Sequence, residues 1–358
     1  MVSPVSPESA ATDTPTVRSW PQIALVLATF VALCFGTTLL PHDPYIRYQQ
    51  LAKTIQFPAA WGYERIAFDP TPVDVAIVGN SRLQASVSAP QLQQELTRKL
   101  GKPVHVANFS MPQEGRNAHY AIVRNLLEHR PEVKLIVLSA IEQMPRDGHP
   151  AFRNIAEPED IAEAPVLINR DYLKDLAQVP FRQMSLFVQT QFPQAFGVSA
   201  QWRRKSYFGT GYDTTASFHS PTGNFVDRDS VIPAADLMGP ARERAESITP
   251  PVLPASAAGI EFAIERHYTT EIAELARAKG VKIAFLYAPI YHYPMTLQDQ
   301  SFYEAIGPVL QEKFLSDHSD WYSDYGHLNR RGAVKATSAL ADFIAGQGLL
   351  GQAEKQGK

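Results

Sequence analysis

The sequence predicts an α/β protein organised around a parallel β-sheet. Three short apolar runs rich in β-branched residues, at 73–78, 104–109 and 133–139, alternate with two stretches of helical spacing. This order is typical of parallel strands joined by crossover helices. A fourth run of the same kind, at 281–287, follows after a long interruption. The sheet is therefore expected to take strands from both halves of the chain.

The first predicted strand, 73–78, runs into the turn Gly-Asn-Ser at 79–81. A helix is predicted over 91–100, because Ser88 can accept hydrogen bonds from N–H groups of the first turn and a proline stands in that turn. A serine between a strand and a helix is typical of a side chain delivered to the edge of a sheet.

The second predicted strand, 104–109, is followed by a loop that contains Gly115 and by an amphipathic helix over 118–129. The third strand, 133–139, is largely apolar. A run without polar alternation is typical of a strand that is covered on both faces of the sheet.

The alternation of strands and helices stops between residues 146 and 259. This stretch holds proline-punctuated short helices over 171–192, a loop-like segment over 207–225 and a proline-rich break at 249–256. Its length without regular alternation indicates an insertion, which we interpret as a cap over the functional site.

The alternation resumes with a helix predicted over 261–279 and the fourth strand at 281–287. Two more helices are predicted, over 298–314 and 332–343. The domain is thus split into halves at 71–145 and 260–345, around the insertion at 146–259. A linker at 41–70 precedes it, and a flexible tail at 346–358 ends the chain.

Residues 20–40 are predicted to be a transmembrane signal anchor, because no charged residue occurs in this run. About 20 residues at ~1.5 Å each span ~30 Å, the thickness of a hydrocarbon core. A cleaved signal peptide and a buried core helix remain alternatives. The single cysteine, Cys34, lies in this run and is expected to act as a small apolar residue, so no internal disulfide is possible.

The tail at 1–19 is polar, rich in proline and serine, and expected to be disordered in the cytoplasm. Short tails before a first span commonly stay inside, although a single arginine gives only a faint charge signal here. The large domain is therefore expected in the periplasm, held at the inner membrane by a single pass.

Charge and composition argue against several classes of function. The net charge of −3 over 358 residues leaves no basic footprint for nucleic acid. The turn after the first strand lacks the G-x-G-x-x-G pattern of dinucleotide sites. One histidine–carboxylate pair without further spaced ligands gives no metal site. No cofactor or metal is therefore expected.

Three side chains point to nucleophilic chemistry. Asp324 and His327 stand three residues apart before the last predicted helix, and Ser81 follows the first strand. A serine hydroxyl is a poor nucleophile until a histidine takes its proton, and a carboxylate orients that histidine. Because carboxyl ends of parallel strands share one edge of a sheet, these groups are expected to converge. The plainer alternatives are a helix cap for Ser81 and a loop ion pair for Asp324 with His327.

Three sequence blocks carry a resemblance to a known family: Gly79-Asn80-Ser81, the loop 108–115, and Asp324-x-x-His327-Leu-Asn. In this order the chain resembles the SGNH (GDSL-like) hydrolase superfamily over roughly 71–145 and 260–345. The resemblance implies a flavodoxin-like three-layer α/β/α fold. It also implies that Ser81 is the nucleophile, His327 the base and Asp324 the residue that orients it.

The resemblance further implies an oxyanion hole built from the backbone N–H groups of Ser81 and Gly115. The chain departs from the family at two places. Asn80 stands where the family usually has aspartate, and the third block, residues 139–142, reads Ser-Ala-Ile-Glu without the family's oxyanion asparagine. Asn117 is the candidate substitute donor. Loss of one such donor can cost ~10²–10³ in rate.

The remaining expectations concern the substrate. Arg82, Tyr291, His292 and Tyr293 are candidate substrate-binding residues, the three aromatic ones because rings stack on sugars; core packing is the alternative. A single span with an extracytoplasmic domain is similar to proteins of polysaccharide O-acetylation and lipoteichoic-acid D-alanylation. This implies a serine O-acyl esterase or acyltransferase whose partners are a cell-surface polysaccharide, an acyl donor and other membrane proteins of polysaccharide assembly. The alternative is an inactive scaffold that binds glycan.

Overall fold

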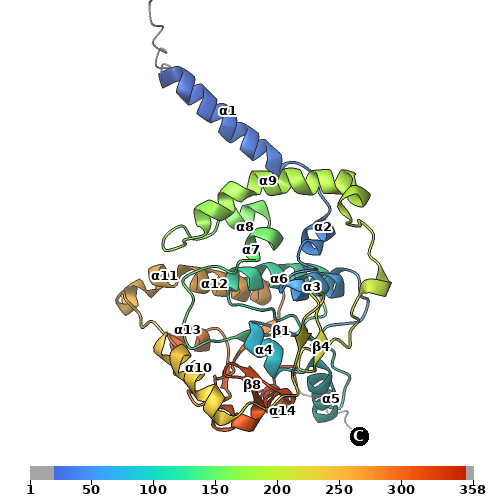
Figure 1. Ribbon diagram of the computed structural model, residues 1–358, viewed down its shortest axis with the longest axis vertical. Helices are drawn as coiled ribbons and strands as arrows, with labels where there is room; N and C mark the ends of the chain where they lie inside the picture. The colour runs from blue at the N-terminus through green and yellow to red at the C-terminus, as the bar shows by residue number, and fades with distance from the viewer. Residues whose placement is uncertain (1–19, 352–358) are drawn as a thin grey trace, which may run out of the picture.

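A parallel sheet of five strands lies at the centre of the structure, in the order β2-β1-β3-β6-β7 (Figure 1). The computed structural model describes residues 20–351, so the predicted tail at 1–19 and the end of the tail at 346–358 lie outside the described residues. The strands are β1 (Val75–Val78), β2 (Val106–Asn108), β3 (Leu135–Ser139), β6 (Lys282–Tyr287) and β7 (Val309–Gln311). The predicted α/β class with a parallel sheet is confirmed.

The sheet joins the two halves of the chain through the pairing of β3 with β6, in which Leu135 lies opposite Lys282 and Ser139 opposite Leu286. Strand β1 pairs with both β2 and β3. All four residues of β1 and all five of β3 are buried, as their apolar composition predicts.

Helices cover both faces of the sheet. Ala76 and Val78 of β1 face a core with α3 (Phe57–Ala67), α6 (Arg116–His129) and α12 (Ala263–Ala278). Val75 and Ile77 face the other core, which is built from three further helices, α4 (Ser81–Ser86), α5 (Ala89–Leu100) and α14 (Arg330–Gly346). Figure 1 shows the strands between α6 and α12 on one side and α5 and α14 on the other.

The predicted start of α5 is confirmed, because the Ser88 side chain accepts a hydrogen bond from the N–H of Gln91 at 3.4 Å. The same hydroxyl donates to Asp213 at 2.7 Å, so the cap also fixes a segment of the insertion. Ser88, which the sequence identified as a helix cap, thus also holds a residue 125 positions further along the chain.

The segment 41–70 is part of the folded core and not a free linker. Its two helices are α2 (Pro44–Gln49) and α3, and Tyr45, Tyr48 and Trp61 are all buried. These three aromatic residues therefore pack within the domain. The rings of Tyr48 and Tyr63 stack at 4.3 Å, and the Trp61 indole N–H donates to the carbonyl of Gly209.

The helix predicted over 298–314 is wrong. The chain forms only the short α13 (Gln300–Glu304) and then enters the sheet as β7. Gly307 allows this, since a Cβ at that position would lie 2.2 Å from the carbonyl oxygen of Ile283. Pro308 follows directly, and proline cannot continue a helix.

The insertion has two parts. The first packs beside α2 and contains α7 (Phe152–Ile155), α8 (Pro158–Ala162) and α9 (Tyr172–Gln191). The stretch 171–192, predicted as several short helices, is mainly this one 20-residue helix, with Pro180 inside it. The second part contains β4 (Phe218–His219), β5 (Phe225–Val226), α10 (Ala234–Glu246) and α11 (Ala258–Glu261).

Short single-turn elements and one hairpin complete the described chain. The 3₁₀ turns are η1 (Pro193–Phe196), η2 (Arg204–Ser206), η3 (Ala255–Ala257), η4 (Lys313–Asp317) and η5 (Ser319–Trp321). The hairpin consists of β8 (Tyr322–Asp324) and β9 (His327–Leu328), directly before α14. The chain does not fray at residue 346, because Leu349 and Leu350 are buried in the core beside α5.

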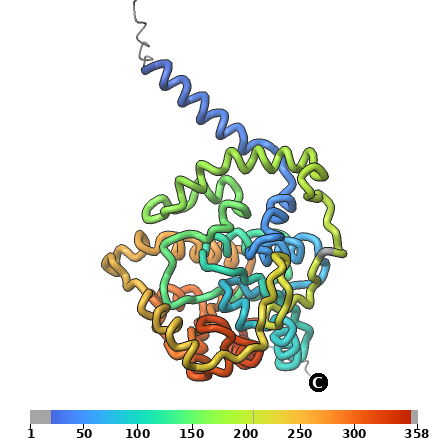
Figure 2. Tube along the Cα trace, in the orientation of Figure 1, coloured from blue at the N-terminus to red at the C-terminus, as the bar shows by residue number. Residues whose placement is uncertain are grey.

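The N-terminal helix α1 (Trp20–Thr38) is long and apolar enough to cross a membrane, and none of its residues is buried in the protein. Figure 2 shows it projecting from the body as a single rod. Its C-terminal part contacts α9. Such a helix is compatible with a single-pass anchor.

Glu312, just after β7, is a buried carboxyl group whose oxygens accept no hydrogen bond from residues 20–351. Burial raises the pKa of this group well above its usual range. The folded protein therefore keeps the proton at pH values where the unfolded chain releases it. Stability contributed by the neutral group is present at acidic pH and falls as the pH rises past the ordinary glutamate pKa.

We expect Glu312→Met to flatten this fall and to raise the free energy of unfolding by about 1–3 kcal/mol at pH 8, since an unpaired buried polar group is removed. The measurement is urea unfolding of the full-length protein in detergent at pH 5 and pH 8. Glu274→Met, at an exposed position on α12, is the control and should leave the pH dependence unchanged. An equally steep fall in Glu312→Met would contradict the prediction.

Candidate active site

Ser81, His327 and Asp324 form one hydrogen-bonded row at the carboxyl end of the sheet. The Ser81 hydroxyl lies 2.7 Å from Nε2 of His327. Nδ1 of the same ring lies 2.8 Å from Oδ2 of Asp324. With the ring proton on Nδ1, the imidazole donates to Asp324 and the serine hydroxyl donates to Nε2. The structure thus brings together all three residues that the sequence singled out as catalytic candidates.

Ser81 is held by the turn between β1 and α4. Asn80 caps α4, because its Oδ1 accepts hydrogen bonds from the N–H groups of Arg82 and Leu83 at 3.0 and 3.3 Å. Asn108, at the end of β2, donates from Nδ2 to the carbonyls of Leu83 and Val87. The two asparagines therefore fix the start and the end of the helix that carries the serine.

The hairpin β8–β9 positions the histidine. Oδ1 of Asp324 accepts hydrogen bonds from the backbone N–H groups of Gly326 and His327, at 2.8 and 2.9 Å. Asn329 caps α14 by accepting from Arg331 and Gly332. The spacing of three residues between Asp324 and His327 therefore has a local reason: the carboxylate closes the turn and reaches the ring at the same time.

The Asp324 carboxylate is half exposed. Partial burial acts to raise its pKa, but the hydrogen bond and charge of His327, with the two backbone N–H groups, outweigh burial and lower it. Arg228, from the insertion, is buried nearby; burial lowers the pKa of its guanidinium, and the charge of Asp324 opposes that shift. Asp324 is therefore held in its ionised form.

The second part of the insertion runs beside Ser81, His327 and Asp324, which we call the triad. Thr214 donates to the carbonyl of Gln84 on α4, and the carbonyl of Arg228 accepts from the N–H of Arg330 at 2.6 Å. Asn329 donates to the carbonyl of Ser230. The interpretation of the insertion as a cap fits this part, whereas the part with α7, α8 and α9 packs around α2 and α1 instead.

Arg82 does not present a free guanidinium to a substrate. It forms a two-pronged ion pair with Glu142, with both Nη atoms at 2.6 Å from the carboxylate oxygens. Arg244 of α10 also donates to Glu142, at 2.9 and 3.1 Å. Burial alone would raise the pKa of Glu142, but the hydrogen bonds and charge of Arg82 and the charge of Arg244 outweigh it and lower the pKa to about 2. The expected role of Arg82 in substrate binding is thus replaced by an ion pair.

The candidate oxyanion donors differ in their availability. Within residues 20–351, the backbone N–H groups of Ser81 and Gly115 donate to no protein acceptor. The Asn117 side chain is engaged elsewhere: its Oδ1 accepts from the N–H groups of Ala118 and His149, and its Nδ2 lies against Gly148. The expectation that Asn117 replaces the missing donor is therefore not met.

The three candidate aromatic residues after β6 have different environments. Tyr291 is buried and packs on Tyr322 with ring centres 5.6 Å apart, so its interpretation as a sugar-stacking residue is wrong. His292 is exposed and Tyr293 is half-buried. No hydrogen bond within the described part of the chain joins these two side chains to Ser81 or His327.

Glu114 is a residue of the site region that the sequence did not single out. Its carboxyl group lies near the Asn80 side chain, yet no hydrogen bond of normal geometry from residues 20–351 reaches its two buried oxygens. Burial raises the pKa of Glu114 to about 7 against the opposing charge of Arg116. Its place directly before Gly115, in the block that carries the resemblance, was the available signal.

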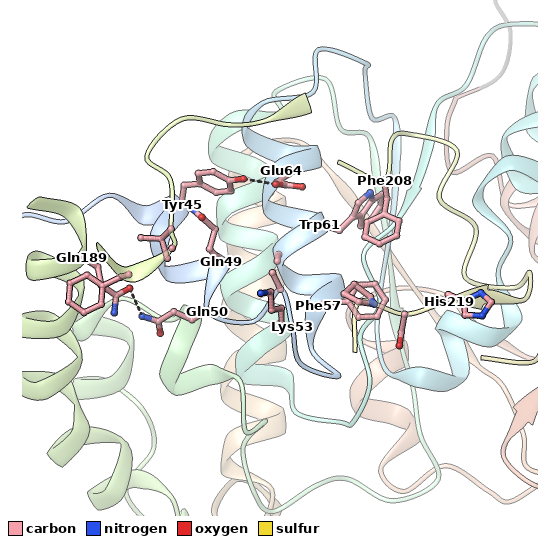
Figure 3. A pocket seen from close by; sticks show the side chains of 17 residues that line it. Tyr45, Gln49, Gln50, Lys53, Phe57, Trp61, Glu64, Gln189, Phe208 and His219 are labelled. Carbon is pink, nitrogen blue, oxygen red and sulfur yellow. Dashed lines mark hydrogen bonds between the residues drawn. The ribbon is translucent and has the colours of Figure 1, made fainter. Parts of the chain in front are cut away.

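A cavity of about 790 Å³ lies away from the triad, between α2, α3, the end of α9 and the β4 strand (Figure 3). Aromatic residues including Phe57, Trp61 and Phe208 line it, with Lys53 and Gln50 among its polar groups. None of the triad residues is in its wall. Among residues 20–351, no group of three or more His, Cys, Asp and Glu side chains could hold a metal ion.

Comparison with known proteins adds no assignment: the chain matches no family model, and no curated protein is significantly similar to it in sequence.

Removal of the Glu142 charge should destabilise the folded protein. We expect Glu142→Gln to lower the free energy of unfolding by about 3–5 kcal/mol, because two arginines would lose their buried partner. The measurement is urea unfolding of the full-length protein at neutral pH. Glu163→Gln, at the exposed position directly after α8, is the control and should change stability by less than about 0.5 kcal/mol. Equal stability of the two variants would contradict the importance of the ion pair.

Proposed function

We propose that this protein is a serine O-acyl esterase or acyltransferase of the SGNH type, anchored in the inner membrane with its domain in the periplasm. The observation that supports this most directly is the row formed by Ser81 Oγ, the His327 ring and the Asp324 carboxylate, joined at 2.7 and 2.8 Å. A helix cap or a surface ion pair would not require Ser81 and His327, 246 residues apart, to meet at this distance.

The proposed reaction has two acyl-transfer steps. Ser81 Oγ attacks the acyl carbonyl carbon while His327 Nε2 takes its proton, and the tetrahedral intermediate collapses as His327 returns the proton to the leaving alcohol. The acyl-serine is then attacked by water or by a sugar hydroxyl, which His327 deprotonates, and Ser81 regains its proton. Asp324 keeps the ring in the required tautomer and stabilises its charged form throughout.

The oxyanion of each intermediate would be stabilised by the backbone N–H groups of Ser81 and Gly115, which have no protein acceptor in the described chain. The loop 139–142, which is expected to supply the family's third donor, contains no asparagine, and its ionised Glu142 cannot donate. A hole with two donors predicts slow turnover compared with relatives that have three. Slow turnover is compatible with acyl transfer to a polysaccharide that is present in large amounts.

The fold supports this assignment. Counted along the chain, the sheet strands lie in the order 2-1-3-4-5, which is the flavodoxin-like order. Helices cover both sheet faces, as a three-layer α/β/α domain requires. Ser81 follows the first strand, beside the point where the strand order reverses, and open α/β sheets bind ligands there.

The substrate class follows from the resemblance and from the anchor. An acyl group on a cell-surface polysaccharide is the expected substrate or product, with a separate acyl donor and other membrane proteins of polysaccharide assembly as partners. The alternative, an inactive scaffold that binds glycan, is less favoured because the serine and the histidine are hydrogen-bonded and the histidine is oriented by Asp324.

The first test is labelling of the full-length protein in detergent with a fluorophosphonate probe. We expect stoichiometric labelling of Ser81 and its loss in Ser81→Ala, because only an activated hydroxyl attacks phosphorus. Ser323→Ala is the matched control, since this serine lies in the hairpin of His327 and its hydroxyl donates to the backbone carbonyls of His327 and Leu328. An unlabelled wild type, or labelling that persists in Ser81→Ala, would reject the proposal.

The second test concerns Asp324. We expect Asp324→Asn to lower hydrolysis of p-nitrophenyl acetate by about 10²–10⁴-fold, because the amide favours the wrong imidazole tautomer. Initial rates at saturating substrate give the change, and released acetate compared with acetylated oligosaccharide separates hydrolysis from transfer. Asp320→Asn, in the turn before β8, should keep wild-type rates. A loss below about threefold would show that Asp324 has no role in orienting the base.

A further inference from the structure

Helix α9 carries a stripe of exposed apolar side chains on the face that points away from the protein core. These residues are at least about one-third exposed; they are Leu173, Leu176, Phe181, Met184, Val188 and Phe192. At 100° per residue they fall within about half of the helix circumference. So many large apolar side chains on one solvent-exposed face indicate a surface that contacts a membrane or another protein in the cell.

The opposite face of α9 is the one that packs on the protein. Val179 and Leu186 are buried there, and Arg182 donates to the carbonyl of Arg153 at 2.6 Å. Between residues 176 and 196 Arg182 is the single charged residue in the sequence, and its side chain belongs to the buried face. The exposed side of α9 is therefore apolar or uncharged along almost its full length.

The stripe continues at both ends of the helix. Before α9, the loop residues Val166, Leu167 and Ile168 are 59%, 65% and 43% exposed. After it, Phe196 is also exposed. The apolar surface is thus longer than the helix, and it lies on the side of the body from which α1 emerges (Figure 1).

The contact between α9 and α1 sets the depth of this surface. An apolar groove of about 530 Å³ lies between the two helices, with Phe30 and Cys34 of α1 on one wall and Leu176, Val179 and Pro180 of α9 on the other. From Phe30 to Thr38 a helix rises ~12 Å. If α1 spans a hydrocarbon core, the middle of α9 lies level with the outer part of that core.

We propose that α9 and the loop 166–168 form a second membrane contact, with the apolar stripe immersed in the outer leaflet and lipid acyl chains filling the groove between α1 and α9. This rests on the proposed anchoring of the domain by α1. A helix with one apolar face and its polar groups turned to the protein suits the boundary between headgroups and acyl chains.

The charges around the stripe agree with this placement. Arg170 and Lys174, at its N-terminal end, form ion pairs with Asp147 and Asp171, and their side chains, 79% and 60% exposed, are long enough to reach lipid phosphates as well. Glu159 of α8 is the one acidic side chain in the wall of the groove, at its rim. The contact fixes the orientation of the body: β8 and α14 lie at the end opposite α9, so the triad faces away from the bilayer (Figure 1).

The experiment measures the depth of single labels in the full-length protein reconstituted into phosphatidylcholine–phosphatidylglycerol vesicles. An environment-sensitive nitrobenzoxadiazole dye is attached at Phe181→Cys or Val188→Cys, each combined with Cys34→Ala. Ala28→Cys in α1 reports the span, and Gln94→Cys on α5, which is exposed, reports water. Spin-labelled lipids quench a dye in the bilayer, and iodide quenches a dye in water.

We expect the dyes at residues 181 and 188 to lose fluorescence to the spin-labelled lipids and to be shielded from iodide, as at residue 28. Quenching by iodide as strong as at residue 94, with residue 28 still in lipid, would overturn the contact of α9 and leave the anchor standing. A dye at residue 28 in water would overturn both. Shielding from iodide without quenching by lipid would also overturn the proposal, because protein would then cover the stripe.

A variant with added charges in the middle of the apolar stripe tests the same contact, with the dye placed nearer the end of the helix. Phe181→Glu with Met184→Glu should lower the lipid quenching of a dye at residue 188, since carboxylates avoid the hydrocarbon region. Both positions are exposed, so the fold should persist. Gln178→Glu, which is exposed but lies off the stripe, is the matched control and should leave the quenching unchanged. Equal quenching in all three proteins would contradict the contact.

Discussion

One buried carboxylate, Glu142, holds together the segments that frame Ser81. It accepts hydrogen bonds from Arg82 on the helix of the serine and from Arg244 on α10, and Arg82 also reaches the carbonyl of Ala288 after β6. These groups come from both halves of the α/β domain and from the insertion. In a low-dielectric interior such an arrangement tolerates little displacement, because each charge depends on the position of the others. The position of Ser81 therefore rests on an ion pair and not on apolar packing alone.

The sequence predicted the parts of this structure that depend on local signals. Apolar runs located four of the five sheet strands, and Ser88 located a helix start. Asp324 and His327 were placed correctly just before the last helix, although the hairpin that they form was not predicted. The meeting of Ser81 with His327 could be predicted as well, because carboxyl ends of parallel strands share one edge.

The misjudged parts depend on contacts between distant residues. Strand β7 has three half-buried residues and a signal too short to recognise, and it exists because β6 provides a partner. Arg82 looked available for a substrate because its partner is 60 residues away. Tyr291 looked like a sugar platform, whereas Tyr322 and Leu315 bury it in a satellite core. Burial and pairing of polar side chains are properties of the whole fold, and no local pattern of the chain reports them.

The separation of Ser81 and His327 along the chain has a consequence for biosynthesis. Ser81 is made early, whereas His327 follows only 246 residues later. In the folded protein, β6 is joined to β3 and the hairpin of His327 lies against α4, and both contacts are needed for the two side chains to meet. Under the proposed function, Ser81 stays inert in a chain that is still being made, because His327 has not yet reached it. Under the proposed function, Ser81 becomes reactive only when the hairpin of His327 has docked, so its reaction with a serine probe would report this step of folding.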